Sequence, residues 1–380
     1  MQPIEETDTS VTEIAQKVVQ AGGAPTVACG VRYRMADRWF EETGVAEGTF
    51  RAGSDSAAKT WVFDLASVTK PFFAMAVHTA ITSGLLEETT TLAELCPALD
   101  HTRASQCSAY SLLSHRSGLV AHVELFRCLR ARQPKQRMAL LQFAANSTVE
   151  PYDLMKDNRF PPVYSDLGYF LLGAAIEHHF EMPLDEWCIR VAKQWWPQDL
   201  GSSRQWRMRD DFSTVTRFIP TEVVPWRGGL LSGVVHDENA WLLSGHSLSG
   251  HAGLFGTVEA VLEFGVMVLD SLAGRKSPIP RRATERATAH YPDGSLCAGF
   301  DRRSNVGSAA GSFCSGETFG HLGFTGTSLW CDPLREIVVV VLANRVCPTR
   351  ENVMIRSLRP LVHDALFRWA DRQQNRSTVR

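Results

Sequence analysis

The sequence predicts an α+β fold in which strands from both ends of the chain enclose a long helical insertion. Three observations support this prediction. Strand-like segments lie before residue 63 and again after residue 325, residues 84–244 form mostly helical segments and irregular loops, and no internal repeat or low-complexity linker interrupts the chain. This order is typical of an antiparallel sheet flanked by helices, with a cleft between the sheet and the inserted helices.

The first elements are a helix and three strands. Apolar residues at helical spacing predict a helix over residues 11–21, which two glycines end. Residues 25–33 predict a strand, and two further strand candidates follow before residue 63. Residues 1–24 are therefore expected to form an N-terminal segment and helix ahead of the sheet.

The following helices have recognisable ends. A strongly apolar helix is expected to begin at residue 67 and to end near Gly84, a residue well placed as a C-terminal cap. A later helix is predicted over residues 254–272, with Thr257 as a candidate N-cap and Glu259 in its first turn.

Two strands and a helix close the chain. Residues 326–331 predict a strand, and the continuous apolar run of residues 337–342 predicts a central buried strand. An amphipathic helix is expected over residues 351–371. The predicted domains are an α/β domain (25–80 and 245–372), a mostly helical inserted domain (81–244) and a polar tail (373–380).

Composition limits the partners of this chain. The 380 residues are 44% hydrophobic with a formal charge of -2, so no global charge attracts nucleic acid or a membrane. Nine scattered cysteines, together with an acidic start that lacks a secretory signal, predict reduced thiols and a cytoplasmic protein. A periplasmic location is expected instead if a signal has been removed. The oligomeric state is open.

Ser67-Val-Thr-Lys70 is the first segment that indicates chemistry. On a helix, residues three apart share a face, so the Lys70 amine can lie beside the Ser67 hydroxyl. A hydroxyl at a helix N-terminus also has free N–H groups nearby, which favour negative charge. A serine nucleophile needs both a neighbouring base and donors for the oxyanion.

Two later segments complete a candidate site. Tyr164-Ser-Asp166 places a phenol and a carboxylate on one turn before an apolar helix. His321-Leu-Gly323 leads into a predicted strand, where the glycine is expected to allow close approach of a substrate and to leave an N–H free.

These segments together resemble the serine β-lactamase and penicillin-binding protein superfamily, most closely its class C and esterase-like branch. That family has Ser-x-x-Lys, Tyr-x-Asn and Lys-Thr-Gly (or His-x-Gly) in this order. Leu112-Leu-Ser-His-Arg-Ser-Gly-Leu119 and Gly250-His-Ala-Gly-Leu-Phe-Gly-Thr257 are similar to two further family segments. The resemblance covers about residues 25–345 and implies a β-lactamase-like fold.

The resemblance also implies roles for individual residues. Ser67 is expected to be the acylated nucleophile, with Lys70 or Tyr164 as the base. The backbone N–H groups of Ser67 and Phe324 are expected to form the oxyanion hole. His321 is expected to face the cleft, where it would bind a substrate carboxylate or steady Tyr164, and Gly323 is expected to contact substrate. No cofactor or metal is implied.

Two residues depart from the family pattern. Asp166 stands where Asn is usual, and a carboxylate beside Lys70 should hold the amine protonated and favour Tyr164 as base. His321 replaces the usual Lys and is mostly uncharged at neutral pH, which weakens attraction for a β-lactam carboxylate. The sequence therefore predicts a serine hydrolase that acts on an ester, a D-amino-acid amide or peptide, or a β-lactam. The alternative is a penicillin- or peptide-binding sensor that does not turn over.

Several other segments have simpler explanations. Gly245-His-Ser-Leu-Ser-Gly250 nearly matches a nucleophile elbow but has no strand before it, so we interpret it as a loop. His236, Asp237, Glu238, His246 and His251 match no standard zinc spacing. The basic stretch from Arg127 to Arg137 is expected to be solvated, and Trp195, Trp196 and Trp226 are expected to pack inside the protein or to line an acyl pocket.

Overall fold

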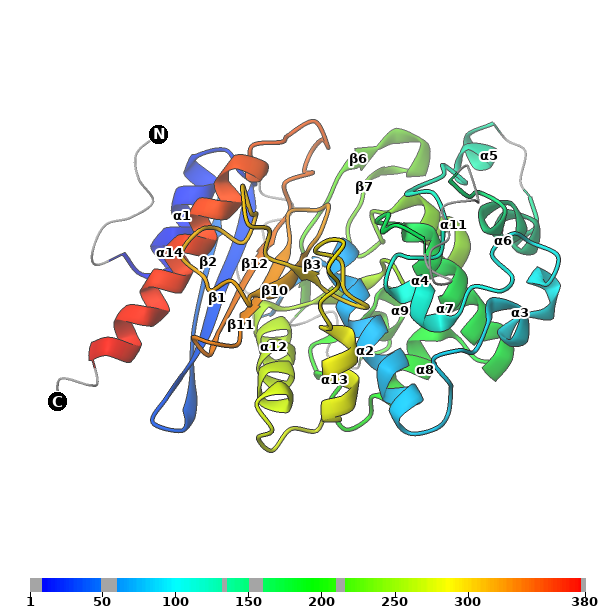
Figure 1. Ribbon diagram of the computed structural model, residues 1–380. Helices are drawn as coiled ribbons and strands as arrows, with labels where there is room; N and C mark the ends of the chain where they lie inside the picture. The colour runs from blue at the N-terminus through cyan, green and yellow to red at the C-terminus, as the bar shows by residue number, and fades with distance from the viewer. Residues whose placement is uncertain (1–8, 49–59, 132–134, 150–159, 210–215, 377–380) are drawn as a thin grey trace.

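A six-stranded antiparallel sheet contains strands from both ends of the chain (Figure 1). In this computed structural model, which describes residues 9–48, 60–131, 135–149, 160–209 and 216–376, the strand order is β2-β1-β12-β11-β10-β9. The strands are β1 (Thr26–Met35), β2 (Arg38–Glu47), β9 (Asp301–Arg302), β10 (Phe319–Leu322), β11 (Ser328–Asp332) and β12 (Ile337–Ala343). The predicted α+β class is confirmed.

Helices cover both faces of this sheet. Helices α1 (Val11–Gln20) and α14 (Ile355–Arg376) pack on one face, and α12 (Val258–Leu272) packs on the other. Strand β12 is buried along its whole length because side chains on both of its faces meet a helix layer. Its uninterrupted apolar sequence follows from this position.

The structure also contains a second, smaller sheet, and only its strand near residue 63 agrees with a strand candidate of the sequence analysis. Its strand order is β4-β8-β3-β5, formed by β4 (Leu200–Ser202), β8 (Leu254–Gly256), β3 (Thr60–Asp64) and β5 (Thr216–Phe218). Residues 254–256 are thus a strand, and the expectation of a helix there was wrong. Thr257 does cap α12, since its side chain accepts a hydrogen bond from Ala260 N at 3.2 Å.

The segment between the strands is mostly helical, with α2 (Thr69–Thr82) buried at its centre (Figure 1). The other helices are α3 (Leu92–Leu95), α4 (Ala109–Leu113), α5 (Arg127–Arg130), α6 (Arg137–Ala145), α7 (Asp166–Phe180), α8 (Leu184–Val191), α9 (Ser203–Arg207), α11 (Glu238–Ser244) and α13 (Arg281–Ala287). Short strands β6 (Val223–Val224) and β7 (Gly229–Leu230) form a separate pair.

Four further features can be compared with the sequence. The closing helix α14 begins at Ile355 and continues to Arg376, beyond the predicted end at residue 371. Helix α11, rather than a strand, precedes Gly245, so the near-elbow segment is a helix-terminating loop. Among the helices of the described ranges, none combines the length and the apolar character needed to cross a bilayer. All nine cysteines are free thiols.

Candidate active site

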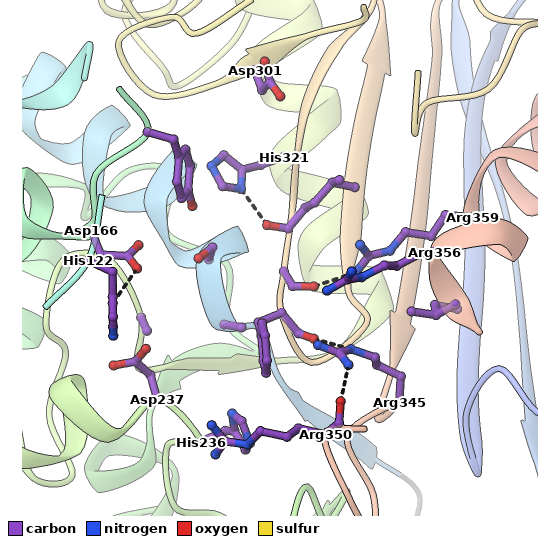
Figure 2. Close-up of a pocket in the computed structure, with 18 of the residues that line it drawn as sticks. His122, Asp166, His236, Asp237, Asp301, His321, Arg345, Arg350, Arg356 and Arg359 are labelled. Atoms are coloured by element: carbon purple, nitrogen blue, oxygen red, sulfur yellow. Dashed lines mark hydrogen bonds and ion pairs between the residues drawn. The ribbon is translucent and has the colours of Figure 1, made fainter. Parts of the chain in front are cut away.

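The residues that the sequence singled out meet at one cavity of about 550 Å³ (Figure 2). Strand β10 and the loop after it form one wall, and the turn before α7 forms the opposite wall. Ser67, Tyr164, Asp166, His321 and Phe324 line the cavity. Lys70 lies beneath them, fully buried.

Lys70 donates three hydrogen bonds to three acceptors. Its Nζ lies 2.9 Å from Ser67 Oγ, 2.6 Å from Asp166 Oδ1 and 3.5 Å from the His251 carbonyl oxygen. Ser67 is in a 3₁₀ turn (Ala66–Val68) that leads directly into α2, which places the Ser67 and Lys70 side chains on one face. An amine with three acceptors is an ammonium ion, because no lone pair remains to accept a proton.

Electrostatics support the charged form of both partners. Burial alone would lower the pKa of Lys70, but Asp166 and Tyr164 outweigh burial and raise the pKa. Burial alone would raise the pKa of Asp166, yet the Lys70 ammonium and His122 hold it well below its usual range. Lys70 and Asp166 therefore form an ion pair, as expected for a carboxylate in place of the usual Asn.

Tyr164 lies over this pair. Lys70 Nζ is 4.8 Å from the centre of its ring. Burial raises the pKa of Tyr164, and the Lys70 charge, together with polar interactions with Lys70 and Ser67, only partly opposes that rise. The resting phenol is therefore protonated, and a phenolate forms only as a minority state.

His115 fixes the turn that carries Tyr164. Its Nδ1 accepts a hydrogen bond from Ser165 N at 3.0 Å, and its carbonyl oxygen accepts one from Val163 N at 3.0 Å. The His115 ring lies between Tyr164 and Tyr169, with ring centres 4.8 and 5.1 Å away. Its backbone has φ +60°, which costs free energy at a non-glycine residue. The Leu112–Leu119 segment thus holds the phenol in place.

Two backbone N–H groups are available as oxyanion donors. Among the described residues, neither the Ser67 N–H nor the Phe324 N–H donates to an acceptor of this chain. Thr325 and Thr327 tie the strand end to the segment before Ser67, since their hydroxyls donate to the carbonyl oxygens of Asp64 and Leu65, both at 2.8 Å. These contacts keep the two N–H groups on adjacent, anchored segments.

Gly323 was expected to allow close approach of a substrate and to leave its own N–H free, but the structure indicates a packing role. Its N–H is not free, because it donates to the Thr327 carbonyl oxygen at 2.7 Å. A Cβ atom here would collide with Thr327 Oγ1 and with the Leu65 carbonyl oxygen. The glycine therefore permits close packing beneath the strand end, and the free N–H belongs to Phe324.

His321 is neutral. It is 5% exposed, and burial, helped by the nearby Lys70 charge, lowers its pKa to about 3. Its Nδ1–H donates to the Leu322 carbonyl oxygen at 2.8 Å, which leaves Nε2 as an acceptor. The ring centre lies 5.9 Å from that of Tyr164. His321 thus stands beside the phenol and supplies no positive charge for a carboxylate.

Sequence reasoning gave no site role to two histidines next to Asp166. His122 Nδ1 lies 3.6 Å from Asp166 Oδ2, and this contact raises the pKa of His122. His251 Nδ1 faces the Ser249 carbonyl oxygen at 2.9 Å, and its Nε2 faces Asp237 at 3.0 Å. Burial lowers the pKa of His251, but the Asp237 carboxylate outweighs burial and raises it, and two acceptors beside the ring favour the doubly protonated form.

Four arginines on the opposite side were also missed. Arg345, Arg350, Arg356 and Arg359 line the cavity next to the start of α14 (Figure 2). Arg350 pairs with Glu222 and Glu238, but the other three have no ion pair with any residue of the described ranges. The spacing Arg356-x-x-Arg359 on one helix face was the signal in the sequence.

The remaining tryptophan candidates pack away from the cavity, whereas His236 lines it. Trp195 packs on Trp196 and Phe264, and none of these lines the cavity. Trp226 stacks on Phe126. His236 pairs with Glu222 at 2.8 Å. The basic stretch after Arg127 includes residues 132–134, which lie outside the described residues.

Comparison with known proteins identifies the family. The model of the Beta-lactamase family matches residues 11–363, and the chain belongs to this family. Proteins of Salmonella enteritidis PT4 (strain P125109) and Salmonella typhi, both named "Putative D-alanyl-D-alanine carboxypeptidase", are 31% and 30% identical over 198 residues. These matches cover 48% of this chain, which spans somewhat less than half (45%) of the length of each relative.

Solved structures confirm the β-lactamase-like fold. A D-amino acid amidase from Ochrobactrum anthropi SV3 has a TM-score of 0.63 and 16% identity, and the match covers 96% of this chain and 98% of that chain. A β-lactamase/D-alanine carboxypeptidase from Pseudomonas syringae has a TM-score of 0.62 and 16% identity, covering 93% and 98%. EstCE1, a hydrolase with promiscuous acyltransferase activity, has a TM-score of 0.67 and 18% identity, covering 94% and 97%.

Proposed function

We propose that this protein is a serine hydrolase that cleaves an ester, a D-amino-acid amide or a β-lactam through a Ser67 acyl-enzyme. The observation that supports this most strongly is the contact of Ser67 Oγ with Lys70 Nζ at 2.9 Å beside two unoccupied N–H donors. A nucleophile, a proton-transfer partner and an oxyanion hole are the three parts that acyl transfer needs.

In the first step, Ser67 Oγ attacks the carbonyl carbon and loses its proton to the Lys70–Tyr164 pair. Asp166 keeps Lys70 charged, so the reactive minority form is a Tyr164 phenolate held by the Lys70 ammonium. The N–H groups of Ser67 and Phe324 bind the oxyanion. Tyr164 then returns the proton to the leaving oxygen or nitrogen. In the second step it takes a proton from the water that attacks the acyl-enzyme and gives that proton to Ser67 Oγ as the ester bond breaks, which restores the resting site.

Charge favours some substrates over others. Neutral His321 offers no attraction for a carboxylate, which supports an ester or an amide over a β-lactam. Arg356 is exposed at the cavity and has no ion pair within the described ranges, so a substrate that carries a carboxylate would meet it there. The names of the relatives, which include a D-amino acid amidase and carboxypeptidases, support an amide substrate.

The decisive experiment measures acylation and turnover together. Intact protein is exposed to 4-nitrophenyl acetate, a D-amino acid amide and nitrocefin, and the acyl-enzyme is followed by mass spectrometry. We expect a mass increase at Ser67, steady hydrolysis of at least one substrate, and loss of both in Ser67→Ala. Ser247→Ala, in the near-elbow loop, is the matched control. Full activity in Ser67→Ala would refute the proposal.

The second candidate is a sensor that is acylated but does not turn over. Tyr164, Lys70 and Ser67 are in mutual contact at this site, so a general base for the attacking water is present, and this favours the hydrolase. Stoichiometric labelling of Ser67 without release over hours, on every substrate tested, would instead support the sensor.

A further inference from the structure

Arg359 is a buried cation without a counter-ion. It is 8% exposed, and its Nε has no hydrogen-bond partner. Burial lowers its pKa to about 10, with repulsion from Arg345 and Arg356 adding to the effect, and no described carboxylate offsets it. A buried, uncompensated charge costs free energy, so a functional role would explain why the protein keeps Arg359 at this position.

The contacts of Arg359 suggest that reason. Its Nη2 donates to the Gly323 carbonyl oxygen at 2.6 Å and to the Thr327 carbonyl oxygen at 3.2 Å. The Gly323 carbonyl and the Phe324 N–H belong to the same peptide group. A charged donor on the carbonyl oxygen polarises that group and makes its N–H a stronger donor, because hydrogen bonds in a chain reinforce one another.

Arg345 holds the next carbonyl along the strand end. Its Nε donates to the Phe324 carbonyl oxygen at 2.7 Å, and its Nη1 donates to the carbonyl oxygens of Arg350 and Asn352 at 2.9 and 2.8 Å. The guanidinium also lies over the Phe324 ring, 4.3 Å from its centre. With Arg359 on the Gly323 carbonyl oxygen and Arg345 on the Phe324 carbonyl oxygen, the peptide on either side of Phe324 is held in its orientation.

We propose that Arg359 is a positioning residue of the oxyanion hole: with Arg345, it orients and polarises the Gly323–Phe324 peptide that binds the oxyanion. This inference rests on the proposed acyl-transfer function. The uncompensated positive charge of Arg359 costs free energy in the resting enzyme. The negative charge of the tetrahedral intermediate compensates it, so the cost is offset only when that intermediate forms. An interaction of this kind stabilises the transition state more than the bound substrate.

A direct role in binding a substrate carboxylate is the main alternative. Both hydrogen bonds of Arg359 go to backbone oxygens, whereas exposed Arg356 presents its charge to the cavity. The two roles separate when the substrate has no carboxylate. Loss of carboxylate binding leaves a neutral ester unaffected, while a weakened oxyanion hole slows every substrate.

The test compares Arg359→Met with Arg359→Lys on the neutral ester 4-nitrophenyl acetate. We expect the acylation rate constant in Arg359→Met to fall by about 10²-fold with unchanged substrate dissociation constant. Affinity for phenylboronic acid, which forms an anionic tetrahedral adduct with serine, should fall in parallel. Arg359→Lys keeps one charged donor and should recover part of both. Val339→Ala, in the sheet core, controls for lost stability.

Three results would overturn the inference. The first is an acylation rate within twofold of wild type in folded Arg359→Met. The second is a loss confined to carboxylate-bearing substrates. The third result applies if Arg359→Met does not fold, and it uses folded Arg359→Lys. The inference is overturned if this variant binds the ester more weakly but keeps the wild-type acylation rate and boronic acid affinity. Failure of the proposed function is distinct, because wild-type protein would then show no acylation at Ser67.

Discussion

The two sides of the cavity differ in whether their charged side chains form ion pairs. On the Asp166 side, every charged group has a partner: Lys70 with Asp166, and His251 with Asp237. On the arginine side, Arg345, Arg356 and Arg359 form no ion pair with a carboxylate of the described residues, and only Arg345 feels a more distant carboxylate, that of Glu222 (Figure 2).

This difference follows the chemistry that each side would perform. Protons move on the Asp166 side, and paired groups can exchange a proton without creating a buried net charge. Negative charge develops at the oxyanion hole on the arginine side, where cations fixed in advance stabilise it without reorganisation. Variants on each side therefore break different steps.

Lys70→Met should have the largest effect, because it removes the cation from the Asp166 side. We expect acylation of 4-nitrophenyl acetate to fall by about 10³–10⁴-fold. Asp166 would lose its buried partner, at a cost of about 3–5 kcal/mol in the free energy of unfolding. Burst kinetics and chemical denaturation measure the two effects. Adding Asp166→Asn should restore stability but not activity, and an active Lys70→Met would refute the assigned role.

Tyr164→Phe should come next, with acylation and deacylation both slower by about 10²–10³-fold. The ring stays against His115, so the melting temperature should change little. Tyr169→Phe is the matched control: its hydroxyl donates to the Leu113 carbonyl oxygen at 2.9 Å, away from Ser67. That variant should lose stability and keep activity. Equal rates in Tyr164→Phe and wild type would show that the phenol transfers no proton.

The sequence predicted the Asp166 side well and the arginine side hardly at all. Ser67, Lys70, Tyr164 and Asp166 lie in short segments whose spacing alone brings pairs of them together. Arg345 and Arg359 act through backbone carbonyls of a distant loop, and no local pattern reveals such a contact. The longest helices and the central strands were predicted because their apolar periodicity is local.

The errors in the fold prediction share one physical cause. Residues 254–256 form a three-residue strand whose apolar side chains also suit a helix, and only pairing with distant β3 and β4 decides between the two. Gly323 was assigned to substrate access because the sequence does not show Thr327 and the Leu65 carbonyl beneath it. The apolar periodicity of a segment gives no information about the distant residues that pack against it.

Asp166→Asn should shift the pH dependence of acylation to lower pH. Burial affects the pKa of both Lys70 and Tyr164, lowering the first and raising the second, and Asp166 raises both. Without the carboxylate, the Lys70–Tyr164 pair loses its proton at lower pH, so the acidic limb of the rate profile moves to lower pH. An unmoved limb would show that the carboxylate has no influence on the base.

The same variant tests stability. The depressed pKa of Asp166 means that the ionised carboxylate stabilises the fold above its unfolded pKa, near 4, and that this stabilisation is lost as pH falls below that value. The wild type should therefore lose part of its advantage over Asp166→Asn on acidification from pH 6 to pH 3, with further loss at still lower pH. Unfolding by urea at several pH values measures the difference in the free energy of unfolding between the two proteins.

Arg356→Gln should have the smallest effect and the most selective one. Arg356 is exposed at the cavity, so solvent screens its charge and limits an ion pair with a substrate to about 1 kcal/mol, or roughly fivefold in affinity. We expect a higher KM for nitrocefin, which carries a carboxylate, and no change for a neutral ester. Arg282→Gln, equally exposed on α13 and outside the cavity, is the control. Because Arg359 should slow both substrates and Arg356 only one, the pair of variants separates the buried cation that acts on the oxyanion from the exposed cation that meets the substrate.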